Sequence, residues 1–164
     1  MIEAVPQNDL FAEYSGNYRH KVDRSHRVAL PVCWRPDGWP QSFVVARWPI
    51  CEEGTVPEKQ HLLVLTPERW RAVYATLTTQ SISDPKAAAL SREIGSAYAR
   101  LTLDKVGRLP LMDWLARDAG IEDEALLLGL VNRFEIWNPK RYAEFQADSK
   151  RLASETYKQI AVRK

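Results

Sequence analysis

Two stretches of the sequence place an Asp four residues before an Arg. The first pair is Asp23 and Arg27, and the second is Asp104 and Arg108, 81 residues further along. In a short polar turn the carboxylate can accept backbone N–H groups or pair with the guanidinium, which holds the Arg fork at the tip of the turn. Because a fixed guanidinium grips phosphate or reads guanine, the repeated pairs predict two anion-binding turns.

Further cations surround both pairs, since each copy has an Arg four residues before the Asp and a basic residue directly after it. The predicted binding residues are Arg19, Lys21, Asp23, Arg24, Arg27, Arg100, Asp104, Lys105 and Arg108. The net charge of the chain is only +2, but residues 18–35 carry five cations and one anion, and a local patch of this kind is what electrostatic docking requires. The alternative is that each pair is a salt bridge that stiffens its own turn, worth ~0–1 kcal/mol if exposed.

Four segments match the pattern of a known family in the order in which that family has them. They are Tyr14-Ser15-Gly16-Asn17-Tyr18 running through Val22-Asp23 to Arg27-Val28-Ala29-Leu30-Pro31, then residues 62–70 (LLVLTPERW), then residues 103–109 (LDKVGRL), and finally Ala119-Gly120-Ile121 with Phe134-Glu135-Ile136-Trp137. Over roughly residues 11–145 the chain therefore resembles MraZ, the bacterial transcriptional regulators associated with the division and cell-wall gene cluster.

The resemblance implies two tandem swapped-hairpin modules of the SpoVT-AbrB type, related by a pseudo-twofold. It also implies a ring-like homo-oligomer that binds double-stranded DNA through the Asp-x-x-x-Arg turns. The implied target is a set of short G-rich direct repeats in the protein's own promoter, and the implied location is the cytoplasm, at the nucleoid. No cofactor or metal is implied. The alternative class is a structural or protein-interaction oligomer, in which the Asp–Arg turns only brace the fold.

The chain departs from the family pattern in three places. His26 stands where the second copy has Gly107, Met112 stands where the first copy has Pro31, and an extra segment near Trp48–Gln60 makes the first half nine residues longer. Gly adopts a positive φ freely whereas His does so uncommonly. If the turn demands that conformation, the first copy is either strained or built differently.

The elements that must position these turns are mostly strands, so the expected class is mainly β with short helices (α+β). Period-2 alternation and apolar runs predict strands near residues 17–22, 28–30, 42–47, 62–65, 98–103, 109–111, 125–130 and 134–137. Capping signals predict helices after Thr66, Asp84 and Asn138, and a short helix over 113–119. The expected division is a first repeat over 11–80, a linker helix with the second repeat over 84–145, and a basic tail over 146–164, with residues 1–13 as a loosely held arm.

Composition argues against an enzyme or a membrane protein. Cys33 and Cys51 form no C-x-x-C pair, the three His lack metal-ligand spacing, and no Gly-rich phosphate loop or nucleophile elbow is present. No apolar run approaches the ~18–20 residues of a membrane span, and the N-terminus lacks the plan of a signal peptide.

Residues 140–164 carry seven cations and three anions. We interpret this C-terminal segment as a solvated helix, and the alternatives are that it makes a second contact with phosphate or docks a partner.

Overall fold

The computed structural model describes residues 13–50, 57–77 and 83–162, so the arm expected over residues 1–13 lies almost wholly outside the described residues. Strands and helices appear close to the expected positions. In chain order they are β1 (Asn17–Lys21), β2 (Arg27–Ala29), the 3-10 turn η1 (Val32–Trp34), β3 (Ser42–Trp48), η2 (Pro57–Lys59), β4 (His61–Leu65), α1 (Pro67–Leu77), α2 (Pro85–Ser96), β5 (Tyr98–Thr102), β6 (Arg108–Pro110), α3 (Asp113–Asp118), β7 (Glu124–Gly129), β8 (Phe134–Trp137) and α4 (Pro139–Val162).

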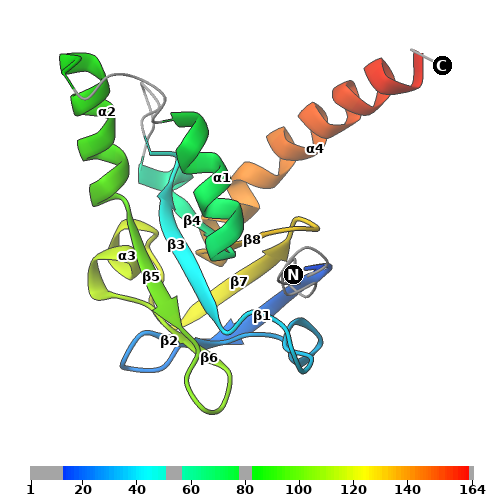
Figure 1. Ribbon diagram of the computed structural model, residues 1–164. Coiled ribbons are helices and arrows are strands. Elements are labelled where there is room, and N and C mark those ends of the chain that lie inside the picture. The colour runs from blue at the N-terminus through cyan, green and yellow to red at the C-terminus, as the bar shows by residue number, and fades with distance from the viewer. Residues whose placement is uncertain (1–12, 51–56, 78–82, 163–164) are drawn as a thin grey trace, which may run out of the picture.

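The strands form a six-stranded sheet in the order β1-β7-β8-β4-β3-β5 and a two-stranded ribbon of β2 and β6. Every neighbouring pair is antiparallel. Each half of the chain lends a strand to the other, because β1 pairs with β7 and β5 pairs with β3. Helices and strands are thus combined in an α+β fold, as expected (Figure 1).

The strand registers follow a pseudo-twofold. In the ribbon Arg27 lies opposite Pro110 and Ala29 opposite Arg108, and the 81-residue offset converts one pair into the other. The offset maps the central pair, Val28 and Leu109, onto itself, so the local axis passes beside it. The β4–β8 pairing has the same property, with an offset of 72 residues from Leu62 to Phe134. The two repeated sequences therefore occupy equivalent positions in one body.

The extra residues of the first half lie between β3 and β4. β3 pairs with β5 as β7 pairs with β1, so each residue of β3 corresponds to the residue of β7 that lies 82 positions further along the chain. Each residue of β4 corresponds to a residue of β8 that lies only 72 positions further along. The connection from Trp48 to Gln60 accommodates the difference and includes η2, while its residues 51–56 lie outside the described part of the chain.

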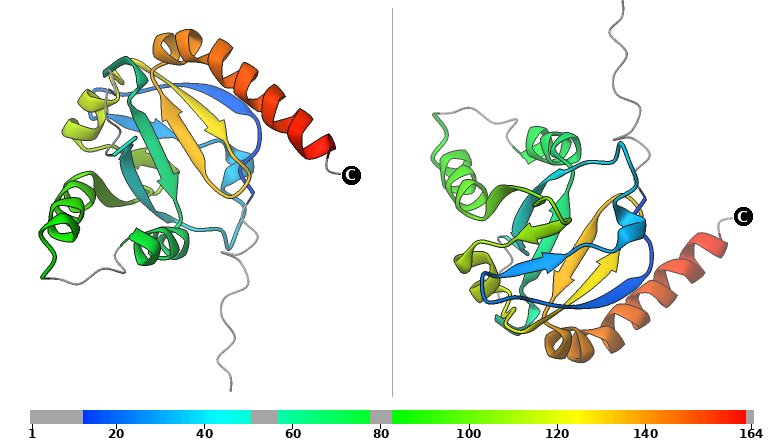
Figure 2. Two further views of the ribbon diagram at one scale, coloured as in Figure 1. Left: turned by 90° about the horizontal axis from the view of Figure 1, so that it is seen from above. Right: turned by 90° about the horizontal axis from the view of Figure 1, so that it is seen from below.

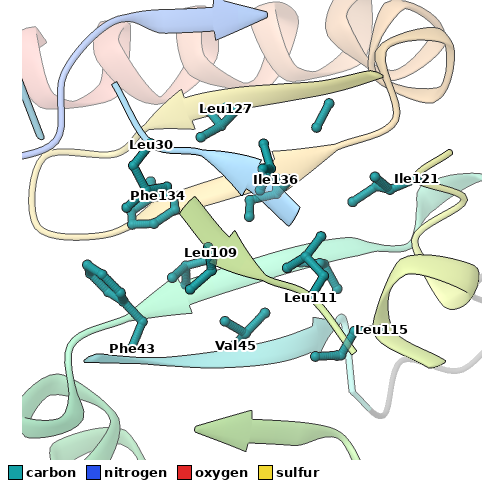
Figure 3. Packing of buried hydrophobic residues seen from close by; sticks show 14 of the residues in the cluster. Leu30, Phe43, Val45, Leu109, Leu111, Leu115, Ile121, Leu127, Phe134 and Ile136 are labelled. Carbon is teal, nitrogen blue, oxygen red and sulfur yellow. The ribbon is translucent and has the colours of Figure 1, made fainter. Parts of the chain in front are cut away.

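The main core lies between the sheet and the ribbon. Val28 and Leu109 of the ribbon belong to it together with Phe43 and Val45 of β3, and all four are fully buried. Figure 3 shows Leu109, Phe43 and Val45 lying together in this core. The alternate residues of β3 and β4 face a second cluster with Trp70 of α1 and Ile94 of α2. Burial on both faces explains why these two strands read as continuous apolar runs.

The predicted caps begin the helices. The Thr66 Oγ1 accepts the Arg69 N–H at 3.4 Å, the Asp84 Oδ1 accepts the Lys86 N–H at 3.0 Å, and the Asn138 Oδ1 accepts the Lys140 N–H at 2.8 Å. Each cap satisfies a backbone donor that has no partner within the helix. Two further views show α1 and α2 grouped together and α4 running outward from the sheet (Figure 2). No helix in the described ranges combines the length and apolarity needed to cross a bilayer.

Candidate functional site

The two Asp–Arg turns have the same backbone hydrogen bonds. In the first turn the Asp23 N–H donates to the Arg27 carbonyl at 3.1 Å, and the His26 N–H donates to the Asp23 carbonyl at 2.9 Å. The second turn repeats both bonds at 2.9 and 3.0 Å between the residues 81 positions further along. The duplicated sequence therefore builds the same loop twice.

Each Asp uses both carboxylate oxygens to hold its turn. The Asp23 Oδ1 accepts the N–H groups of Ser25 at 2.9 Å and Arg27 at 3.0 Å, and its Oδ2 accepts the Arg27 Nε at 2.7 Å. The Asp104 Oδ2 accepts the Arg108 Nε at the same 2.7 Å. Because the carboxylates hold each Arg by Nε, the outer nitrogens of the guanidinium remain available for other acceptors.

These bonds also determine the charge state of the carboxyl groups. The backbone N–H of Arg27, followed by its guanidinium and the Ser25 N–H, outweighs desolvation and lowers the pKa of Asp23 below 3.8. The Arg108 N–H and guanidinium lower the pKa of Asp104 in the same way. Both groups are therefore carboxylates at neutral pH, and the turns keep their hydrogen bonds and ion pairs.

The ribbon brings the two turns together. The Arg108 Nη1 lies 3.5 Å from the Asp23 Oδ2, across the pseudo-twofold. Arg27 and Arg108 point to the outer face of the ribbon, because the residues that follow them, Val28 and Leu109, face the core. Their side chains are 37% and 33% exposed, so water or a ligand can reach both. We call Asp23, Arg27, Asp104 and Arg108 the Asp–Arg cluster.

The remaining predicted residues lie in three places. Arg24 and Lys105 are exposed in the two turns, beside the Asp–Arg cluster. Arg19 and Arg100 lie on β1 and β5, which form opposite edges of the six-stranded sheet, so the fold does not bring them together. Arg19 also pairs with Glu124 at 3.5 Å. Lys21 is exposed at the end of β1. Figure 1 shows both turns at the lower end of the molecule, away from α1, α2 and α4.

The turns differ where His26 replaces Gly. His26 has a φ of 54° and Gly107 a φ of 79°, so the positive φ expected of this position is present in both copies. The His26 Nδ1 lies 2.9 Å from the Asp113 Oδ1, at the start of α3. Gly107 instead packs against Arg35, and a Cβ there would lie 1.9 Å from the Arg35 Nη1.

Sequence reasoning missed these two partners. Asp113 is 87 residues from His26 in the chain, and no motif or regular spacing in the sequence connects the two positions. Arg35 was visible only as one cation of a basic stretch, whereas in the structure its Nε donates to the Leu30 carbonyl at 3.0 Å. In the described part of the chain, no three His, Cys, Asp or Glu residues gather in a way that could hold a metal ion.

Comparison with known proteins identifies relatives along most of the chain. Residues 96–163 match the family model described as "MraZ protein, putative antitoxin-like". The "Transcriptional regulator MraZ" of Ligilactobacillus salivarius is 30% identical over 148 residues, which cover 90% of this chain and 94% of that protein. The protein of the same name from Halothermothrix orenii is 28% identical with the same coverage of both chains.

These relatives support a role in transcription regulation rather than an enzymatic one. The chain belongs to the MraZ family.

Proposed function

We propose that this MraZ-family protein binds double-stranded DNA with the outer face of the β2–β6 ribbon. Arg27 and Arg108 contact guanine or phosphate, while Asp23 and Asp104 fix the orientation of the two forks. The observation that carries the proposal is that one hydrogen-bonded Asp–Arg turn is built twice and that both copies meet on one face. β Ribbons fit the major groove of DNA, and an Arg side chain can read guanine bidentately.

The exposed cations beside the Asp–Arg cluster supply the net attraction. Within the cluster two carboxylates balance two guanidinium groups, so the cluster itself is neutral. Lys21, Arg24 and Lys105 are exposed around it, and within the described part of the chain none of them forms an ion pair. Neutralising phosphates with such residues releases counterions, which makes affinity depend on salt. Arg19 and Arg100 extend the contact toward the two sheet edges.

The target follows from the resemblance to MraZ: a series of short G-rich direct repeats in the promoter of the protein's own division and cell-wall gene cluster, in the cytoplasm at the nucleoid. A ring of copies would multiply weak contacts on successive repeats through effective concentration. In this arrangement the reading units are the repeats over 11–80 and 84–145, and residues 146–164 form a separate basic tail.

A second candidate function is a structural oligomer in which the Asp–Arg turns only brace the fold. The contact between Arg108 and Asp23 favours it, because this ion pair links the two turns across the ribbon. The two roles differ in what they predict for the affinity of the protein for DNA. Only the DNA-binding role requires that this affinity depend on the DNA sequence and on the side chains of Arg27 and Arg108.

The test is a titration of fluorescent promoter DNA and of a scrambled duplex with wild type and Arg27→Ala. We expect wild type to prefer promoter DNA and Arg27→Ala to lose about tenfold or more in affinity for it, since one bidentate contact to a base is worth ~1–3 kcal/mol. The matched control is Arg92→Ala, an exposed Arg of α2. Equal binding of both duplexes by wild type, or an unfolded Arg27→Ala protein, would favour the bracing role.

A further inference from the structure

The second Asp–Arg turn carries an apolar side chain at its tip. The Gly107 N–H donates to the Asp104 carbonyl at 3.0 Å, so Lys105 and Val106 are the two central residues of a four-residue turn. Val106 is 62% exposed and belongs to neither of the two apolar clusters of the core. Figure 1 shows this turn, between β5 and β6, projecting at the lower end of the molecule. The proposed DNA-binding face thus includes an apolar group that the contacts of Arg and Lys do not use.

The position of Val106 is fixed relative to Arg108. A single exposed Val is common on protein surfaces, so exposure alone says little about it. Here, however, one carboxylate oxygen holds both residues, because the Asp104 Oδ1 accepts the Val106 N–H at 3.0 Å and the Arg108 N–H at 2.9 Å. The Arg35 Nη1 lies 3.5 Å from the Val106 carbonyl oxygen on the other side. The turn therefore presents the Val106 side chain in a fixed place beside Arg108.

The first turn has a polar group at the equivalent position. The 81-residue offset places Ser25 in correspondence with Val106. The Ser25 N–H donates to the Asp23 Oδ1 at 2.9 Å, as the Val106 N–H does to Asp104, and Ser25 is also exposed. A hydroxyl group forms hydrogen bonds with phosphate or with any base edge, whereas an isopropyl group forms none. The two tips therefore share one backbone arrangement and differ in what they can recognise.

An apolar group of the DNA is the partner that suits the Val106 side chain. Burying an isopropyl group against a phosphate or a base donor would leave the polar group without a hydrogen bond, which is unfavourable. Among the base edges of the major groove, the apolar group is the C5-methyl of thymine. Neighbouring base pairs are about 3.4 Å apart along the helix axis, so a residue two positions from Arg108 in the chain reaches the adjacent base pair.

We propose that Val106 contacts the C5-methyl group of a thymine adjacent to the base pair at which Arg108 binds. The inference rests on the proposed function, because it requires the ribbon to lie in the major groove. It makes the two turns unequal readers. The second turn distinguishes thymine from cytosine through Val106, and the first turn, with Ser25 at its tip, does not.

The first experiment removes the methyl group from the DNA. Fluorescence anisotropy measures the affinity of wild type for the promoter duplex and for the same duplex with every thymine replaced by deoxyuridine, which forms the same base pair without the methyl group. We expect this replacement to weaken binding about fourfold, which corresponds to the ~0.8 kcal/mol of one buried CH₂-sized group. Equal affinity of wild type for the two duplexes would overturn the proposal.

The second experiment removes the apolar side chain from the protein. Val106→Ser copies the tip of the first turn, so its affinity for the thymine duplex should fall about fourfold and deoxyuridine should cause little further loss. Its salt dependence should match wild type, because Val106 carries no charge. Val162→Ser is the matched control, since Val162 is 85% exposed at the end of α4, and it should keep the full effect of deoxyuridine. A deoxyuridine effect in Val106→Ser as large as in wild type would overturn the assignment to Val106.

Failure of the thymine contact and failure of the proposed function give different results. If deoxyuridine has no effect while wild type prefers promoter to scrambled DNA and Arg27→Ala loses that preference, DNA binding by the ribbon is retained and the thymine contact is wrong. If wild type binds promoter and scrambled duplexes equally, the proposed function fails and the thymine contact fails with it. Urea unfolding verifies that each variant is folded.

Discussion

Replacing Gly107 by Ala tests whether the second turn needs a residue without a Cβ. Gly107 has a φ of 79°, and a Cβ there would lie 1.9 Å from the Arg35 Nη1. The left-handed conformation costs a non-Gly residue ~1–2 kcal/mol. Moving Arg35 endangers its 3.0 Å bond to the Leu30 carbonyl, and a hydrogen bond to a charged group contributes ~1.5–3 kcal/mol. Ala also stabilises by ~0.4–1 kcal/mol because it restricts the unfolded chain.

These terms give a net destabilisation of about 2–4 kcal/mol. The assay is urea unfolding at one fixed protein concentration, since association changes apparent stability. Gly95→Ala is the control, because Gly95 lies within α2 with no atom within 4 Å of the added Cβ, and it should stabilise by ~0.5–1 kcal/mol. If Gly107→Ala shifted stability in the same direction as Gly95→Ala, the argument from conformation and Arg35 would be refuted.

The reverse change, His26→Gly, should leave the free energy of unfolding within ~1 kcal/mol of wild type in the same assay. Relief of the left-handed strain stabilises the variant, whereas loss of the partly exposed contact with Asp113 and a more flexible unfolded chain destabilise it by a similar amount. A loss above ~2 kcal/mol would contradict this. The fold lowers the pKa of both Asp23 and Asp104, so the stability that their carboxylates contribute is present above about pH 4 and is lost as pH falls through the folded pKa. Asp23→Asn/Asp104→Asn should therefore lose less unfolding free energy than wild type between about pH 5 and pH 3. Parallel curves of unfolding free energy against pH for the two proteins would contradict this. Leu109→Ala, at the fully buried centre of the ribbon, should cost ~2–5 kcal/mol by the same urea assay, and a cost under 1 kcal/mol would show that the ribbon is not part of the core. Burial alone would raise the pKa of Glu135, but its contacts with His61 and Trp137 outweigh burial and lower that pKa, so Glu135→Gln should destabilise at pH 7 by ~1–3 kcal/mol; a stabilised variant would refute this.

Local chemistry made the strands and turns predictable. Alternation marked β5, continuous apolar runs marked β4, and Thr66-Pro67 marked the start of α1. The repeated Asp and Arg predicted two equivalent turns, and both turns have the expected pairing within the turn. These features depend on neighbours in sequence, so one sequence contains the information for them.

The pairing between distant segments was not predictable in the same way. Nothing near Asn17 indicates that β1 lies beside β7, and nothing near Asp23 indicates that Arg108 reaches it. The contact of His26 with Asp113 depends on α3, whose counterpart in the first half is only the 3-10 turn η1. The resemblance to MraZ implied a pseudo-twofold, and only the registers show which residues lie beside its axis.

The salt dependence of promoter binding tests the central claim most directly. Affinity measured by fluorescence anisotropy between 50 and 200 mM salt should fall with a slope of about −0.9 per phosphate neutralised. For Arg27→Ala/Arg108→Ala, folded as judged by urea unfolding, the account predicts weaker binding together with a shallower slope or a lost preference for promoter over scrambled DNA, while Arg92→Ala follows wild type. Promoter binding by the double variant with the affinity, salt slope and sequence preference of wild type would contradict the account.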